Sequence, residues 1–513
     1  MICKYIKFKK LVNSNSKLKI KINLKKIKME KKFKILLYGG SYDGTPKEGA
    51  EFMHQLISGF NKQGVETLLI TYFNEQRLLL KEKGLNCIYI PSEKEKFIVR
   101  DTQKELRELE IKYDFCAERI LLGDLDYSNS VSRKKAFVDL VKYFKFWEQF
   151  LEKEKPDAIF GGDNRFGNLV PFYISKKKNI NFNIIYWNPM IDNAISISTN
   201  KIGILSELEE MWDKNKNKEL TKEEREKAKK YVQQFRENKE KDLLIITKPT
   251  INFQKIKYAL ERIYASLFIE KRDTPYLRPW RGIKSYFLMF IRARISKFYS
   301  EKPKKGEKFI YFPLHFHLET VLLISHPHFF HQERLVEIIS QNLPAGHKVY
   351  VKSHPGHLGV HELSLFRAIK KLPNVRLINA NTNSRKLIKS SSAVAVIAGT
   401  AGWEATLLKK PVISFGSSYY DFSGLTFRVI DLNNADRIIN QAVINTQFND
   451  EILYKFVNTI KKTIYPGKES FTALYHSNKS NREELLNEKN IKQLVDSLIS
   501  HLKKQTTKRM VNS

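Results

Sequence analysis

The sequence predicts an α/β protein built on open, mainly parallel sheets, and three observations support this fold class. Residues Lys34–Gly40 and Pro156–Gly162 each form an apolar run that ends in a glycine pair, as buried strands do before a turn. A third apolar run, Val394–Ala398, leads through a Gly-Thr-Ala-Gly turn into a helix. The length of 513 residues, with 42% apolar residues, predicts at least two domains with ordinary cores.

The N-terminal elements follow a βαβ order. After the first strand, the apolar spacing predicts a helix over Glu48–Gln63 and a strand over Thr67–Tyr72. The intervening loop holds Asp43 at the carboxyl end of the strand, where ligands of open parallel sheets bind. We therefore expect Asp43 to face a cleft between domains, although a helix N-cap would also explain this residue.

A second strand exit carries a carboxylate in the same way. An amphipathic helix predicted over Arg133–Glu154 precedes the strand, and Asp163 follows its glycine pair, with an amide and a guanidinium at the next two positions. A further strand is expected over Asn183–Trp187. Asp163 is thus a second candidate general base, and an N-cap is again the alternative.

The composition changes in the middle of the chain. Residues 207–241 are highly charged and predict a solvated helix with a linker role. Between Tyr276 and Tyr299, aromatic residues interleave with Arg and Lys. Helices that lie in a membrane interface have this character, with rings in the lipid and cations at the phosphates. A helix pair packed against the N-terminal domain explains the same pattern, and the sequence leaves both interpretations open.

A Lys-Ser-His-Pro motif follows a predicted strand in the C-terminal half. The strand at 348–351 alternates polar and apolar residues and continues into Lys352, Ser353, His354 and Pro355. A histidine and a lysine beyond the carboxyl end of a parallel strand can hold a phosphate or assist a leaving group. Pro355 would fix the turn that aims them, because its ring restricts the backbone.

Histidine is concentrated in the same region. Nine of the twelve histidines lie between His315 and His361, so a zinc site is the first rival explanation. Their spacings come without cysteines, however, and no HExxH signature is present. The sequence therefore predicts no metal site, and several of these histidines are expected to be surface or packing residues.

The Gly-Thr-Ala-Gly turn predicts a phosphate-binding site. Gly399, Thr400, Ala401 and Gly402 are small enough for a ligand to approach the backbone, and the first N–H groups of the following helix lack intrahelical partners. Glu404 follows in the first turn of that helix. The alternative is an ordinary strand-to-helix connection that needs glycine for close packing.

Charge and cysteine content restrict the partners and the location. The net charge of +35 is either a compositional bias or an attraction to polyanions; without a nucleic-acid-binding motif, an anionic membrane surface or acidic glycan is the expected partner. Three widely separated cysteines predict a reducing cytoplasm and no disulfide framework. The sequence contains no run of 18 apolar residues and no convincing signal peptide, and Met29 is an alternative start to Met1.

Several motifs, taken together and in order, resemble the capsule polysaccharide biosynthesis protein family. The resemblance covers about Phe309–Tyr420 and rests on five runs: Phe309–Phe316, Leu343–Pro344, Val349–Pro355, Leu372–Leu377 and Gly399–Ala405. Two positions depart from the family pattern, where His317 stands in place of a glutamine and His331 in place of an aspartate.

The resemblance implies a glycosyltransferase of the GT-B type, with two Rossmann-type domains facing a central cleft and C-terminal helices that return to the N-terminal domain. It also implies a nucleotide-sugar donor, CMP-Kdo-like as in the related Kdo transferases or a UDP-sugar, and no cofactor. The acceptor would be a growing capsule or other surface glycan, or a lipid-linked glycan, met in the cytoplasm or peripherally at the inner face of the cell membrane.

On this interpretation the catalytic candidates are Asp163, Asp43 and His354. The expected donor-binding residues are His315, Lys352, His354, Pro355, Gly399, Thr400, Ala401, Gly402 and Glu404. Two other classes of function stay open: a non-catalytic polysaccharide-binding or export-assembly protein, and a nucleotide-sugar epimerase or hydrolase on the same fold.

The expected organisation has five parts. These are a basic leader at 1–30, an N-terminal acceptor domain at 31–242, a basic-aromatic helical linker at 243–307, a C-terminal nucleotide-sugar domain at 308–449, and helices with a tail at 450–513.

Overall fold

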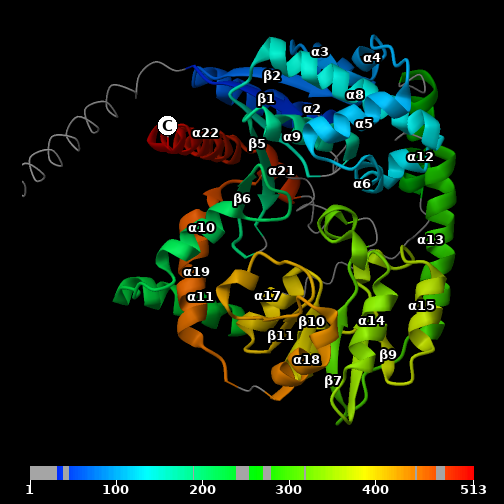
Figure 1. Cartoon of the computed structure of the whole chain (residues 1–513), viewed down its shortest axis with the longest axis vertical. Helices are drawn as coiled ribbons and strands as arrows, with labels where there is room; N and C mark the ends of the chain where they lie inside the picture. Colours follow the sequence, from blue (N-terminus) through cyan, green and yellow to red (C-terminus); the bar gives the residue numbers. More distant parts are fainter. Residues whose placement is uncertain are drawn as a thin grey trace, which may run out of the picture.

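A computed structural model describes residues 32–38, 46–163, 165–188, 190–237, 253–269, 279–316, 319–444, 447–468 and 480–512. Two sheets, one in each half of the chain, are each covered by helices on both faces (Figure 1). Most neighbouring strands in both sheets are parallel. The predicted fold class, α/β with two Rossmann-like units, is confirmed. The predicted leader at 1–30 lies outside the described residues.

The N-terminal sheet has the strand order β3-β2-β1-β4-β5-β6-β13. Its strands are β1 (Lys34–Tyr38), β2 (Glu66–Thr71), β3 (Ile88–Tyr89), β4 (Ala158–Gly161), β5 (Asn181–Trp187) and β6 (Ala194–Thr199), with the distant β13 (Tyr465–Pro466) at the edge. The helices of this half are α2 (Pro46–Lys62), α3 (Asn74–Glu82), α4 (Ile90–Lys94), α5 (Thr102–Tyr113), α6 (Ala117–Leu122), α7 (Leu125–Ser128), α8 (Arg133–Glu154) and α9 (Arg165–Lys177).

Alternation along the first strand explains why this sheet is covered on both sides. Leu36 packs into a cluster formed with helices α5 to α9, whereas Ile35 and Leu37 pack into a second cluster with α2 and the C-terminal helix α22 (Glu488–Asn512). All three side chains are almost completely buried. Strands buried on both faces are apolar throughout, which is why the short apolar runs could be predicted as strands.

Helix α8 has the predicted bounds because both of its ends are specified locally. The Ser132 hydroxyl accepts a hydrogen bond from the Lys135 N–H at 3.3 Å, and Lys155 ends the helix with a left-handed backbone, φ 45°. Between these ends, Leu140, Phe144 and Trp147 are buried against the sheet. An N-cap of this kind contributes about 1 kcal/mol to helix stability.

The C-terminal sheet has the order β12-β11-β10-β7-β8-β9, with every neighbouring pair parallel. Its strands are β7 (Lys308–Pro313), β8 (His347–Lys352), β9 (Val375–Ile378), β10 (Ala393–Val396), β11 (Val412–Ser414) and β12 (Phe427–Arg428). The helices around it are α14 (Gln332–Gln341), α15 (Leu363–Lys370), α16 (Ser384–Ser390), α17 (Thr400–Leu407) and α18 (Ala435–Ile444).

The highly charged segment at 207–241 is helical, as predicted, but its helices also pack against the C-terminal half, which the prediction of a solvated helix missed. It forms α10 (Ser206–Asn215) and α11 (Lys222–Glu237), and residues 238–241 lie outside the described part. Trp212 of α10 and Val232 of α11 are buried in one cluster with Trp403 of α17 and Phe456 of α19 (Asp450–Thr463). The few apolar residues occupy one stripe of each helix. Each helix can therefore bury one face although its composition is strongly charged.

The end of the chain returns to the N-terminal half, as predicted. After α19, β13 pairs antiparallel with β6, and α21 (Ser480–Leu486) leads into α22, which lies along α2 (Figure 1). The contact is close, because a Cβ added at Gly59 of α2 would lie 2.8 Å from a methyl group of Val495. Apolar residues of α22 complete the second N-terminal cluster.

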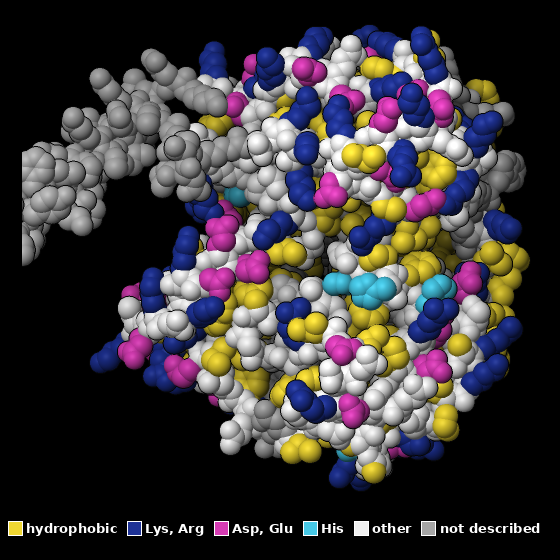
Figure 2. Space-filling view, in the orientation of Figure 1, with side chains coloured by type: hydrophobic (Ala, Val, Ile, Leu, Met, Phe, Trp, Pro, Cys, Tyr) yellow, Lys and Arg dark blue, Asp and Glu magenta, His cyan; other side chains and the backbone are white. Residues whose placement is uncertain are grey.

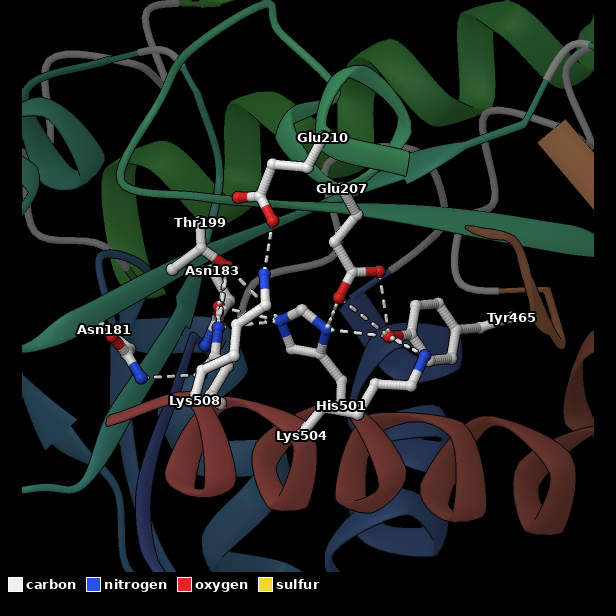
Figure 3. A network of polar contacts seen from close by, with 10 residues as sticks. Asn181, Asn183, Thr199, Glu207, Glu210, Tyr465, His501, Lys504 and Lys508 are labelled. Carbon is white, nitrogen blue, oxygen red and sulfur yellow. Dashed lines mark hydrogen bonds and ion pairs between the residues drawn. The ribbon is translucent and has the colours of Figure 1, made fainter. Parts of the chain in front are cut away.

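A buried polar network fixes α22 in place (Figure 3). His501 of α22 is 1% exposed; its Nδ1 lies 3.1 Å from the Tyr465 hydroxyl and 3.4 Å from a Glu207 carboxylate oxygen. On the other side of the ring, Nε2 lies 3.2 Å from Asn183 Oδ1 and 2.8 Å from Gln505 Nε2. Burial acts to raise the pKa of Glu207, but the hydrogen bonds and charges of its neighbours, His501 first among them, together lower that pKa. The network joins the N-terminal sheet, α10 and α22 through groups that each have partners.

Two helices run along one edge of the molecule and contact both halves (Figure 1). They are α12 (Phe253–Tyr264), which continues as a π-helix at Ala265–Ile269, and α13 (Pro279–Tyr299). The Asn74 amide of α3 donates to the Ile269 carbonyl at 2.7 Å, and Arg292 lies 3.5 Å from Glu362 beside α15. No helix among the described residues is long and apolar enough to cross a membrane.

Candidate active site

The C-terminal sheet has a topological switch point between β7 and β10. From this adjacent pair, β8 and β9 extend the sheet to one side and β11 and β12 extend it to the other. Ligands of such sheets bind beyond the carboxyl ends of the strands at this position. The residues that follow the two strands include His315, after β7, and Gly399, after β10. Two of the predicted motifs are therefore brought to one edge of the sheet.

The turn at Gly399 is shaped by contacts from behind. Gly399 is the N-cap of α17, and its carbonyl accepts a hydrogen bond from the Tyr420 hydroxyl at 2.7 Å. A Cβ added at Gly402 would lie 2.1 Å from that hydroxyl, so only glycine fits there. The first amides of α17, at Thr400 and Ala401, belong to the end of the helix that attracts anions.

His315 lies against this turn. Its side chain is 8% exposed; Nδ1 is 3.0 Å from Glu319 Oε2, and Nε2 accepts from the Ala398 N–H at 3.4 Å. A Cβ at Gly399 would be only 3.2 Å from the ring. The buried Gln332 side chain bonds both the N–H and the carbonyl of His315, at 2.8 and 3.1 Å. The ring is thus fixed beside the predicted phosphate site.

The Lys-Ser-His-Pro motif leaves β8 at the same edge of the sheet. His354 Nδ1 accepts the Gly356 N–H at 3.1 Å, and Pro355 begins a short 3-10 turn. Lys352 is only 2% exposed, and its ammonium donates to the carbonyls of Ala380 at 3.2 Å and Ser353 at 3.5 Å. This geometry favours a structural role for Lys352, which joins the ends of β8 and β9, over a direct phosphate contact.

Glu404 is half-buried on α17, one turn after Thr400. Burial raises the pKa values of the neighbouring Tyr311 and Tyr419. The negative charge of Glu404 raises both pKa values further. Position and partial exposure leave this carboxylate able to accept hydrogen bonds from a ligand at the turn.

His326 is a site residue that the sequence did not single out from the other histidines. Its Nε2 accepts the Ser417 N–H at 2.9 Å, beyond the end of β11, and a Cβ at Gly416 would lie 3.0 Å from the ring. Burial lowers the pKa of His326, so the neutral, accepting form is favoured. Among the described residues, no three or more His, Cys, Asp or Glu side chains gather where they could hold a metal ion.

Asp163 lies at the corresponding switch point of the N-terminal sheet, between β1 and β4. Its loop is held by Asn168 of α9, which accepts the Gly162 N–H at 2.9 Å. The Asp163 carboxylate accepts a hydrogen bond from Thr320 at 3.3 Å and another from Tyr186. Burial raises the pKa of Asp163 in spite of these two donors. Asp43 and His317 lie outside the described residues.

One loop connects the two switch points. The segment between β7 and α14 begins with His315 at the C-terminal turn, delivers Thr320 to Asp163, and then forms a π-helix at Val321–Ser325. Ile324 of that turn packs against α6, where a Cβ at Gly123 would lie 3.1 Å away. Figure 2 shows a furrow between the two halves, with histidine side chains on its lower side. Both sets of candidate residues therefore border one interdomain region.

The fold defines an α/β protein with two Rossmann-like units. In each unit the candidate residues follow the carboxyl ends of the strands, and both sets border the region between the two halves. Residues 275–458 match the model of the family described as capsule polysaccharide biosynthesis protein. The match confirms the resemblance predicted from the motifs and includes both the His354 loop and the Gly399 turn. No curated protein matches the chain.

The solved structures that match the chain have low sequence identity and low TM-scores. The beta Kdo 2,4 transferase KpsC of Thermosulfurimonas dismutans is 13% identical, with 65% of this chain and 88% of that chain covered and a TM-score of 0.32. The UDP-GlcNAc 2-epimerase of Methanocaldococcus jannaschii, in complex with UDP-GlcNAc and UDP, is 12% identical, with 84% and 99% covered and a TM-score of 0.25. A glycosyltransferase from Rickettsia africae is 12% identical, with 89% and 100% covered and a TM-score of 0.28.

Proposed function

We propose that this protein is a glycosyltransferase that transfers a sugar from a nucleotide-sugar donor to a growing capsule or other surface polysaccharide. The observation that carries the proposal is that the family match spans the two loops at the ligand edge of the C-terminal sheet. Those loops combine helix N-terminal amides with histidines, a combination suited to the phosphate of a nucleotide.

The donor would bind at the C-terminal switch point. The N–H groups of Thr400 and Ala401, next to Gly399 and Gly402, would hold the phosphate, with His315 and His354 beside it. Glu404 would accept hydrogen bonds from the ribose. Electrostatic stabilisation of the departing nucleotide by fixed donors lowers the barrier without a metal ion. The CMP-Kdo-like and UDP-sugar donors both fit this chemistry.

The acceptor would enter from the N-terminal side, with Asp163 as the general base. Its carboxylate would take the proton of the acceptor hydroxyl while that oxygen bonds to the anomeric carbon and the nucleotide leaves with the electron pair of the broken bond. The raised pKa of Asp163 supports this role, because a base acts best when its pKa approaches the working pH. Asp43 is the second candidate for the same step.

We place the reaction in the cytoplasm or peripherally at the inner face of the cell membrane, where a lipid-linked glycan acceptor would be met. The excess of Lys and Arg over Asp and Glu, 90 against 55, supports attraction to an anionic surface or glycan. Nucleic acid is not a proposed partner.

Two measurements in sequence test the proposal. Thermal stabilisation by CMP-, CDP- or UDP-sugars would identify the nucleotide, and incubation of that sugar with glycan acceptors would then be followed for a new glycosidic bond. Nucleotide binding with an altered or freed sugar, and no transfer, would assign the protein to the epimerase or hydrolase class. No stabilisation by any nucleotide, together with polysaccharide binding, would favour the non-catalytic alternative.

A further inference from the structure

The outer faces of α12 and α13 are unusually apolar for a protein surface. Half of the large hydrophobic side chains that are exposed in the described residues lie on these two helices and the π-helix between them. They are Ile256, Leu260, Tyr264, Leu267, Phe268, Ile283, Phe287 and Phe298, with exposed fractions between 39% and 89%. A concentration of exposed apolar side chains of this kind indicates an interaction site.

The spacing of these residues gives each helix one outward stripe. On the first helix, Ile256, Leu260 and Tyr264 are four residues apart, and the Tyr264 and Phe268 rings lie 5.0 Å from each other. On α13 the stripe contains Ile283, Phe287 and Phe298. Residues three and four apart share one face of a helix, so the apolar side chains of each helix project in one direction.

The opposite faces hold the helices to the protein. Ala293 and Ser296 of α13 are buried, and the helix lies so close to the loop after His354 that a Cβ at Gly359 would be 1.9 Å from the Met289 carbonyl oxygen. Arg262 of α12 pairs with Glu75 of α3 at 3.0 Å. The outward stripes are therefore fixed in place on the folded protein, with one helix anchored to each half.

Cations accompany the apolar stripe of α13. Lys284, Arg294 and Lys297 are exposed, and the Arg294 guanidinium lies 3.3 Å from the centre of the Phe290 ring. The helix contains no acidic residue. Long cationic side chains above an apolar stripe can bury their stems and reach phosphate groups with their charges.

We propose that the outer faces of α12 and α13 form a docking surface for a lipid bilayer that contains anionic lipids. This names the contact surface for the peripheral location given above, and it adds α12 to the segment that the sequence indicated. A second copy of the chain is the other candidate occupant, but it would bring the same cations to a symmetric contact, and like charges repel. Anionic headgroups supply the complementary charge, and the acyl region accepts the rings.

Sedimentation of the full chain with vesicles tests the surface independently of catalysis. The protein should pellet with phosphatidylcholine vesicles that contain phosphatidylglycerol, and weakly or not at all with phosphatidylcholine alone. Release is expected as salt rises, since exposed charges are screened over about 8 Å at physiological ionic strength.

Two triple variants separate the contributions. Lys284→Gln, Arg294→Gln and Lys297→Gln together should reduce vesicle partitioning about a hundredfold, because each cation near an anionic surface contributes about a fivefold gain. Leu260→Gln, Phe268→Gln and Phe287→Gln together should also abolish pelleting at low salt, because the charges alone do not insert. The matched control is Ile98→Gln, Ile111→Gln and Ile430→Gln, at residues that are 76%, 75% and 85% exposed elsewhere on the surface.

The control variant should pellet like the parent chain, and all variants should keep their thermal midpoint and their nucleotide binding. Equal pelleting of both helix variants and the control would overturn the proposal. So would an absence of vesicle binding by the parent chain combined with self-association that the apolar variant removes. Failure of the transfer reaction with intact vesicle binding would count against the proposed function and leave the docking surface standing.

Discussion

The two switch points of this molecule have the same topology and opposite chemistry. In the C-terminal sheet, the edge is occupied by helix N-terminal amides and by His315, all groups that attract or tolerate an anion. In the N-terminal sheet, the edge carries Asp163, whose carboxylate receives hydroxyl donors and whose pKa is raised by burial. Two similar sheets thus carry different groups at their switch points, donors for an anion at one and a proton acceptor at the other.

This contrast suggests why the reaction would use two domains. A general base has to reach the acceptor hydroxyl rather than the leaving phosphate, and a carboxylate on the facing sheet can do so. His315 lies at the C-terminal edge and Thr320, close to it in the sequence, contacts Asp163 at the N-terminal edge, so neighbouring residues of the chain reach both edges.

The largest effect is expected from Asp163→Asn. A general base contributes about 10²- to 10⁴-fold to the rate, so the turnover number for transfer should fall by that factor while nucleotide affinity is kept. Steady-state kinetics beside nucleotide titration measures both. Asp157→Asn, at the opposite end of β4, is the control, because Asp157 accepts the Lys34 N–H at 2.9 Å and is remote from the site.

The pH profile of transfer by the parent protein tests the same role of Asp163. Because burial raises the pKa of Asp163, the acidic limb of the transfer rate should lie above the ordinary aspartate value of about 3.9. Stability should change in the opposite direction to the transfer rate. Because the pKa of Asp163 is raised in the folded state, the free energy of unfolding should fall as pH rises and the carboxylate becomes charged. Asp163→Asn should therefore keep or raise the thermal midpoint at neutral pH. A lowered midpoint with unchanged activity would remove Asp163 from the chemistry.

The next effect concerns the donor side. His354→Ala should lower the turnover number over KM for the nucleotide sugar by an amount equivalent to about 2 to 4 kcal/mol, the usual loss for one charge-stabilising donor. His347→Ala is the matched control, since His347 begins the same strand, β8, at its far end. Equal kinetics of the two variants would show that the histidine after the strand is not at the donor.

A smaller effect, on stability alone, is expected from the His501 network that holds α22 on the N-terminal half. His501→Ala removes one of the buried partners of Asn183 and one of the buried partners of Glu207, which should cost about 1 kcal/mol of unfolding free energy in denaturant titrations. The exposed His331→Ala is expected to cost nothing measurable. Nucleotide binding by the folded His501 variant should be unchanged; a parallel loss would mean that α22 also shapes the donor site.

No effect at all is predicted for chelation. Amide and imidazole donors meet the phosphate in this account, so transfer should continue in EDTA at the parent rate. Activity that falls on chelation and returns with Mg²⁺ or Mn²⁺ would mean that the phosphate charge is balanced in another way.

The parts that could be predicted from sequence are those with local causes. Apolar runs ending in glycine predicted strands, apolar spacing over Arg133–Glu154 predicted a helix with correct bounds, and motif order predicted the resemblance to the family whose model matches residues 275–458. Packing across the chain could not be predicted in this way. The burial of Lys352, the partnership of Thr320 with Asp163, and the position of His326 all depend on residues brought from other elements.

The charged helices α10 and α11 teach the same lesson. Their composition indicated a solvated linker, and only the stripe that includes Trp212 and Val232 could have signalled packing. A count of charges is insensitive to such a stripe, because two or three apolar residues per helix are enough to bury one face.

A crystal structure with the bound nucleotide tests the central claim most directly. We expect the phosphate at the Gly399 turn, within hydrogen-bonding distance of the Thr400 and Ala401 amides. His354 should lie beside the phosphate, and Asp163 should lie on the facing sheet, toward the sugar. A nucleotide phosphate bound instead at the N-terminal sheet, beyond β4, would contradict the assignment of the two edges.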